Sequence, residues 1–339
     1  MNQLNQAFTI FLSLLVEAMP FLLLGVLFSG VLLLFVDESK LIKMLPRNPL
    51  LGAFAGSLIG CLFPVCECGN VPVARRLLLQ GVPTPVAIGF LLAAPTINPI
   101  VIWSTAIAFW DIQPEIVVLR VVFSLVVATV IGCVFSVQSD LRPLLQPPMA
   151  RELPQPALSS SVANSSSHLL QSGTFLLGET GVPLRMDATL MQNARTKIWA
   201  KKPLKDKLRL LADNTVQELR ELGGVLVIGS AIAAIIQVAV PRDFILSLGQ
   251  GPVTSILAML VLAAVVSICS TVDSFFALSF ASTFTSGSLL AFLVFGPMID
   301  IKGVGLMLMV FQKRAVIYFF ALAAQLTFLL TLFFNLHFS

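Results

Sequence analysis

The chain has 339 residues, of which 57% are hydrophobic and only 11% are charged, with a net charge of +4. A soluble globular protein carries about 25% charged residues, which help to cover its surface. The composition therefore excludes a soluble fold and predicts an all-α integral membrane protein in contact with lipid. No basic helix with interleaved aromatic residues is present, and the chain contains one Tyr, so a nucleic-acid partner is also excluded.

The first half of the chain is a series of apolar blocks. Residues 8–36 predict a membrane-spanning helix rather than a cleavable signal, because the run is about twice as long as the apolar region of a signal peptide. The blocks that follow are 50–65, a short polar piece at 73–81, 85–110 and 116–137. We expect breaks at Cys66–Pro72 and at Ala94–Pro99, because proline interrupts regular helices.

The composition changes after residue 137. Residues 138–214 are rich in Pro, Ser, Gln and Asn and contain ten of the 21 Lys and Arg residues. We interpret them as a flexible basic linker, cytoplasmic by the positive-inside rule, which ends in a basic helix on the lipid surface. The predicted domains are a first transmembrane repeat at 1–137, this linker at 138–214, and a second transmembrane repeat at 215–339.

The second half repeats the plan of the first. Adding 203 to the residue number places Cys66 on Cys269 and Asn70 on Asp273, and after a shift of one residue Asn98 falls on Asp300. The second half is expected to break at 269–273 and at Gly296-Pro297. Matching breaks in two halves are the best sequence indication of a transporter's binding site.

The number of crossings stays open between eight and ten. If the short pieces 73–81 and 274–285 cross the membrane, each half has five spans and the halves are inverted. If those pieces re-enter, each half has four spans and the halves are parallel. The loop charges favour the inverted arrangement, because the parallel one places Lys313 and Arg314 on the side opposite to the other basic loops.

Ionisable residues gather at the breaks. Glu67, Arg75 and Arg76 lie there in the first half, and Asp273, Asp300 and Lys302 in the second. A charge at the bilayer centre costs about 2.5–3.5 kcal/mol, so these groups are expected to pair or to line a cavity. The alternative for the basic residues is that they reach the lipid headgroups. Glu67 and Asp273 are short, which favours a role in a cavity, and a relay of protons through them is a further hypothesis.

Three cysteines lie at the equivalent breaks. Cys66, Cys68 and Cys269 would form a thiol site if the halves meet there, and thiolates bind soft ions and trivalent arsenic. The alternative is that they pack as small hydrophobic residues. The prolines at the breaks are either simple helix kinks or openings that expose helix ends to a substrate.

Two long motifs resemble a known family. The sequence is similar to the signatures of the predicted permease family that includes the ArsP-type organoarsenical efflux permeases. In the first half the similar stretches are Cys61-Leu-Phe-Pro-Val-Cys-Glu-Cys-Gly-Asn-Val-Pro72 and Phe90-Leu-Leu-Ala-Ala-Pro-Thr-Ile-Asn-Pro99. In the second half they are Cys269-Ser-Thr-Val-Asp273 and Phe295-Gly-Pro-Met-Ile-Asp-Ile-Lys302. The resemblance covers the chain except for the linker, and it implies a permease of the inner or plasma membrane.

These observations predict a gradient-driven permease, not an enzyme, that exports a small thiophilic or organometalloid solute. No phosphate-binding G-x-x-x-x-G-K-[ST] motif is present, and we expect no cofactor and no resident metal. The expected partners are lipid, the solute and a proton. The alternatives are a membrane thiol–disulfide oxidoreductase that uses Cys66 and Cys68, and a channel or membrane subunit of a larger complex. The residues expected along the pathway are Cys66, Glu67, Cys68, Asn70, Arg75, Arg76, Pro95, Asn98, Cys269, Asp273, Pro297, Asp300 and Lys302. We further predict that Glu67, Asp273 and Asp300 face a common cavity.

Overall fold

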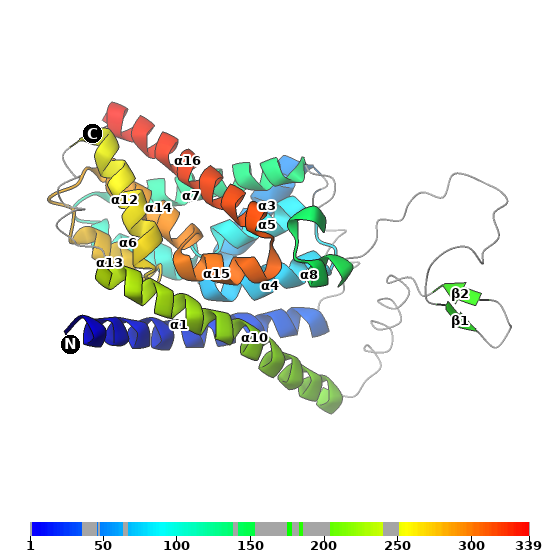
Figure 1. Ribbon diagram of the computed structural model, residues 1–339. Coiled ribbons are helices and arrows are strands. Elements are labelled where there is room, and N and C mark those ends of the chain that lie inside the picture. The colour runs from blue at the N-terminus through cyan, green and yellow to red at the C-terminus, as the bar shows by residue number, and fades with distance from the viewer. Residues whose placement is uncertain are drawn as a thin grey trace.

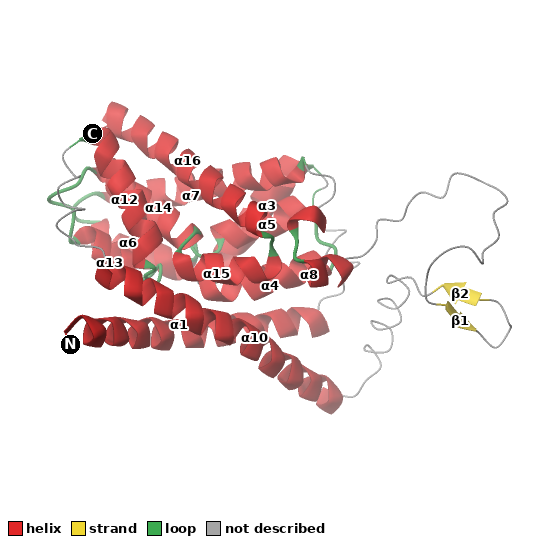
Figure 2. Cartoon of the chain, in the orientation of Figure 1, coloured by secondary structure: helices red, strands yellow, loops and turns green. Residues whose placement is uncertain are grey.

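Helices make up nearly all of the structure. The computed structural model describes residues 2–35, 46, 48–63, 67–137, 142–152, 175–177, 183–185, 204–239 and 251–338. Apart from helices, this part of the chain contains a two-stranded antiparallel ribbon, β1 (Phe175–Leu177) and β2 (Pro183–Arg185), visible in Figure 2. The predicted all-α membrane fold is confirmed.

The helices occur in the same order in both halves. The first half contains α1 (Asn2–Phe35), α3 (Pro49–Leu62), α4 (Glu67–Leu79), α5 (Thr84–Ala93), α6 (Pro99–Phe109) and α7 (Pro114–Ser136). The second half contains α10 (Leu204–Ala239), α12 (Pro252–Val266), α13 (Asp273–Leu278), α14 (Ser286–Met298), α15 (Ile301–Val310) and α16 (Lys313–Phe338). Within each half the second, fourth and last members of this order correspond in packing: α3, α5 and α7 pack on one another, and so do α12, α14 and α16.

Five helical stretches are long and apolar enough to cross a membrane. They are Leu4–Gly30, Pro114–Ser136, Thr215–Val238, Ser286–Val310 and Lys313–His337. Shorter apolar helices lie at 49–62, 84–93, 99–109 and 252–266. Large apolar side chains remain exposed on the outer helices, including Leu24, Trp103, Val118, Ile228 and Phe333. An apolar outer face of this kind is what lipid contact requires.

Small residues allow the helices of the first half to approach closely. A Cβ added to Gly25 of α1 would lie 2.4 Å from the Cα of Gly69 in α4. A Cβ on Gly89 of α5 would lie 2.4 Å from the carbonyl oxygen of Ala53 in α3. Association of helices in lipid depends on this close packing, because lipid tails are as apolar as the side chains.

The second break of each half is capped in the same way. Asn98 precedes α6, and its Oδ1 accepts a hydrogen bond from the N–H of Val101 at 2.9 Å. Asp300 precedes α15, and its Oδ1 accepts from the N–H of Gly303 at 2.6 Å. The matched positions in the sequence therefore form matched helix starts, as Asn and Asp commonly do.

Two of the predicted breaks differ from the structure, one in length and the other in position. The break expected at 66–72 is shorter, because α4 begins at Glu67 and includes Pro72. Pro72 lies early in the helix, where its missing N–H removes a single helical hydrogen bond. The break expected at Gly296-Pro297 falls at Ile299-Asp300, because α14 includes Pro297 and ends at Met298.

The predicted linker differs from the structure at both of its ends. Residues 142–144 and α8 (Pro147–Glu152) are helical, and Leu144, Leu145 and Met149 are buried. The N–H of Gln312 donates to the carbonyl oxygen of Leu144 at 2.7 Å, which ties this segment to the start of α16. At the other end, the boundary proposed between residues 214 and 215 falls inside the continuous helix α10. The rest of the linker, apart from the two strands, lies outside the described residues.

The first helices of the two halves, α1 and α10, run in opposite directions. In Figure 1, α1 runs from the N-terminus at the left of the bundle to the right, and α10 beside it runs from right to left. Phe135 at the end of α7 stacks on Phe319 near the start of α16, with ring centroids 4.2 Å apart, and the two helices pack together. The end of α7 therefore meets the beginning of its counterpart.

Candidate functional site

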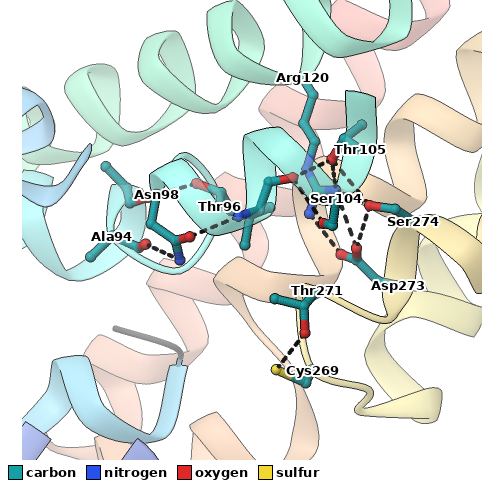
Figure 3. Close-up of polar contacts among 12 residues, drawn as sticks. Ala94, Thr96, Asn98, Ser104, Thr105, Arg120, Cys269, Thr271, Asp273 and Ser274 are labelled. Atoms are coloured by element: carbon teal, nitrogen blue, oxygen red, sulfur yellow. Dashed lines mark hydrogen bonds and ion pairs between the residues drawn. The ribbon is translucent and has the colours of Figure 1, made fainter. Parts of the chain in front are cut away.

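A buried ion pair joins the two halves at the start of α13. Arg120 of α7 and Asp273 of α13 are 1% and 3% exposed. Nη2 of Arg120 donates to Oδ2 of Asp273 at 2.7 Å, and Nη1 donates to Oδ1 at 3.2 Å. Figure 3 shows the guanidinium of Arg120 reaching this carboxylate. A bidentate pair of this kind is the strongest geometry for an Arg and a carboxylate.

Two hydroxyl groups complete the network around this pair. Nη1 of Arg120 also donates to Oγ1 of Thr105 at 2.8 Å and to Oγ of Ser274 at 2.9 Å. Ser274 donates to Oδ1 of Asp273 at 3.1 Å, and its Oγ lies 3.0 Å from that of Thr105. Because Thr105 lies on α6 and Ser274 on α13, the network holds helices of both halves together. Both charges are balanced inside it.

Arg120 is the principal residue that the sequence analysis did not identify. Arg120 lies in an apolar block, whereas the candidate residues were chosen at the helix breaks. A signal was available, because Arg120 is the single charged residue in 116–137. An isolated charge within a membrane span is by itself a reason to look for a partner.

A second buried ion pair joins the halves at the start of α4. Nζ of Lys302, on α15, lies 3.8 Å from Oε1 of Glu67, the first residue of α4. Lys302 is 2% exposed and Glu67 is 5% exposed. A carboxylate in the first turn is also favoured by the dipole of α4. Lys302 therefore does not extend to the headgroups, because its ammonium is enclosed.

More than one carboxylate surrounds Lys302. The carboxylates of Asp300, Glu67 and Glu17 are all near enough to act on its ammonium. Asp300 is 3% exposed, and its Oδ2 is buried with no hydrogen-bond partner among the described residues. Glu17, within α1, is a second charged residue of a membrane span that the sequence analysis did not identify.

The paired arginines of α4 lie at the opposite end of that helix. Nη1 of Arg75 lies 3.6 Å from Oε2 of Glu221 on α10, and both side chains are partly exposed. The charges of Arg75 and Arg76 also act on Glu218, one turn earlier on α10. The arginines therefore contact the helix that leads out of the linker.

The cysteines are only partly described. Cys66 lies outside the described residues. Cys68 in α4 is buried, and Cys269 is buried beside Thr271, whose hydroxyl lies 3.5 Å from its sulfur. Among the described residues, no group of three or more His, Cys, Asp or Glu side chains is placed to hold a metal ion. The predicted three-thiol cluster stays a prediction.

The other predicted pathway residues are buried at the helix breaks. Nδ2 of Asn70 donates to the carbonyl oxygen of Leu91 at 2.5 Å and joins α4 to α5. Asn98 begins α6, whose far end carries Thr105 and so leads to the Asp273 network (Figure 3). Pro95 lies in the turn between α5 and α6, and Pro297 lies in the last turn of α14. Asp300 and Glu67 gather at Lys302, whereas Asp273 belongs to the separate network around Arg120.

Comparison with known proteins identifies the family. A family model described as "Predicted permease", of the ArsP type, matches residues 3–336. The chain belongs to this predicted permease family. The permease is 40% identical over 314 residues to "UPF0718 protein YcgR" of Bacillus subtilis (strain 168), covering 93% of this chain and 90% of the relative. It is 32% identical over 314 residues to the "Putative two-component membrane permease complex subunit" of Streptococcus mutans serotype c, with the same coverage. No solved structure matches the chain.

Membership of this family decides between a transporter and an enzyme. The family description and the name of the Streptococcus relative both indicate a transporter rather than an enzyme. The resemblance that the sequence motifs carried is confirmed, and the protein is a multi-pass membrane permease.

Proposed function

We propose that the permease is a secondary transporter whose pathway lies between its two halves. The observation that carries this proposal is that charged residues at the matched breaks are buried and pair across the halves. Glu67 of the first half meets Lys302 of the second, and Asp273 of the second half meets Arg120 of the first. Charges are retained at such depth where they serve a solute or ion pathway. The breaks between the halves are the expected place for substrate.

We also propose that the two halves are inverted repeats and that the linker is cytoplasmic. The opposite directions of α1 and α10, and of α7 and α16, support inversion. The contact between Leu144 and Gln312 puts Lys313 and Arg314 at the same end as the start of the linker, so the basic segments share one side. Asp111 and Glu115 precede and begin α7, which runs toward that end. This distribution agrees with the positive-inside rule.

For the substrate, we propose a small thiophilic or organometalloid solute that is exported. Cys68 and Cys269 are buried near the starts of α4 and α13, the two short helices that carry the paired acids. Thiolates prefer soft ions and trivalent arsenic. Export driven by a gradient agrees with the absence of a nucleotide-binding motif from the sequence.

Uptake of a trivalent organoarsenical into everted membrane vesicles tests this function. We expect uptake by the wild type to be abolished by a protonophore and by Cys66→Ser/Cys269→Ser. Cys133→Ser is the matched control, because Cys133 lies on the half-buried side of α7 and away from the breaks. Uptake that survives Cys66→Ser/Cys269→Ser would reject the thiol site and keep the exporter. Absence of uptake by the wild type would reject this class of substrate.

A second candidate function is that of a membrane subunit in a larger complex. The Streptococcus relative is named as a subunit of a two-component permease complex. Arg209, in the second turn of α10, is exposed and available to a partner. Purification of the tagged permease from its native membrane at low detergent tests this, and a stoichiometric second protein that is lost when residues 153–203 are deleted would support it.

A further inference from the structure

The charge around Lys302 differs from the charge around Arg120. We propose that Glu67, Asp300 and Lys302 form the site where the permease binds the proton that drives transport, and that Asp300 carries this proton. This inference rests on the proposed function as a gradient-driven transporter. It assigns the coupling ion and the residue that holds it.

The two carboxylate oxygens of Asp300 have different surroundings. Its Oδ1 is held by the N–H of Gly303 at 2.6 Å, which fixes the carboxylate at the start of α15. Its Oδ2 is buried and has no hydrogen-bond partner among the described residues. A buried charge without a compensating bond is costly, and a carboxyl group relieves that cost by taking a proton.

The charged residues on the helices around α15 determine the net charge at Lys302. Glu67 and Cys68 come from α4, and Glu17 comes from α1. From Leu222 to Ala239, α10 contributes no charged residue, and its Gly229 packs against the backbone of Lys302. On α16, Lys313 and Arg314 are exposed. One buried ammonium therefore faces at least two buried carboxylates, and the cluster is negative unless a cation joins it.

A proton fits this place better than a metal ion. No group of three or more potential metal ligands exists among the described residues, and the neighbouring ammonium repels a metal cation. A proton needs a single oxygen, and Oδ2 of Asp300 offers one. Binding from water forms the O–H bond at Oδ2, and release to water on the other side of the membrane breaks it.

The position of Lys302 connects this proton to movement of the halves. Asp300 and Lys302 belong to the second half, and Glu67 belongs to the first. When Asp300 is ionised, it competes with Glu67 for the ammonium. When Asp300 is protonated, Lys302 pairs with Glu67 across the two halves. Proton binding thus changes the strength of a contact between the halves, as coupling requires.

Infrared spectroscopy of the purified full-length protein in lipid tests the site without any substrate. The probe is the proton itself, observed as the carbonyl-stretch band of a buried carboxylic acid while the pH is raised. We expect the wild type to show this band, Asp300→Asn to lose it, and Asp273→Asn to keep it. The Asn substitution should preserve the fold, because Asn98 caps α6 in the same way.

Two results would overturn the proposal. One is a wild type with no such band at any pH at which it stays folded. The other is a band that survives Asp300→Asn and disappears in Glu67→Gln. None of these measurements depends on organoarsenical uptake, so failure here is distinguishable from failure of the proposed transport function.

Discussion

The two buried ion pairs that join the halves have the same plan but different strength. Each places an acid at the first residue of a short helix, Glu67 in α4 and Asp273 in α13, against a buried cation of the other half. The pair between Arg120 and Asp273 is tight, two-pronged and surrounded by hydroxyl groups. The pair between Lys302 and Glu67 spans 3.8 Å and shares its cation with Asp300. The pair of Arg120 and Asp273 is suited to hold the halves together. The pair of Lys302 and Glu67 is suited to become stronger or weaker during transport.

The largest expected effect comes from Arg120→Met, which leaves Asp273 buried without its cation. Breaking a buried pair on one side costs about 3–5 kcal/mol, so we expect a large loss of thermal stability in detergent, measured by size-exclusion chromatography after heating. The double variant Arg120→Met/Asp273→Leu should recover most of the loss, because no charge is then stranded. A double variant as unstable as the single one would show that the pair is not the cause.

Removing the cation of the other pair should cost less stability and more activity. For Lys302→Gln we expect about 1–3 kcal/mol, because Glu67 and Asp300 lose a partner but can take up protons. Gradient-driven uptake into vesicles should be lost while thermal stability stays closer to the wild type than in Arg120→Met. If Lys302→Gln and Arg120→Met destabilise the protein equally, the two ion pairs do not differ in the way proposed.

The matched helix caps at Asn98 and Asp300 offer a further comparison of the halves. Asn98→Ala and Asp300→Ala should each cost about 0.5–2 kcal/mol, because each removes the acceptor of an N–H at the start of a helix. Asp300→Asn should stay close to the wild type in the same thermal assay. A loss of stability in Asp300→Asn as large as in Asp300→Ala would mean that the charge of Asp300, and not its cap, stabilises α15.

The smallest effect is expected at the far end of α4. Arg75 and Glu221 are partly exposed, and exposed pairs contribute about 0–1 kcal/mol because solvent screens them. Arg75→Gln should therefore change thermal stability little, with Arg209→Gln on the exposed side of α10 as the control. A large loss would indicate that this contact anchors the linker helix to the site.

The sequence by itself determined the membrane class, the family, the repeated order of the helices and the matched positions of Asn98 and Asp300. These follow from local properties: apolar run length, proline positions and capping chemistry act within a few residues. The same local information located Glu67, Asp273, Asp300 and Lys302 as candidates, because charges in apolar surroundings are visible in any window.

Only the tertiary structure decided which of these charges meet. Arg120 and Asp273 are 153 residues apart, and Lys302 and Glu67 come from different halves. The exact breaks also depended on packing, since Pro72 and Pro297 remain inside helices that neighbouring helices stabilise. The partner of a buried charge is chosen by how whole helices pack in space, and the spacing of residues along one segment does not contain that information.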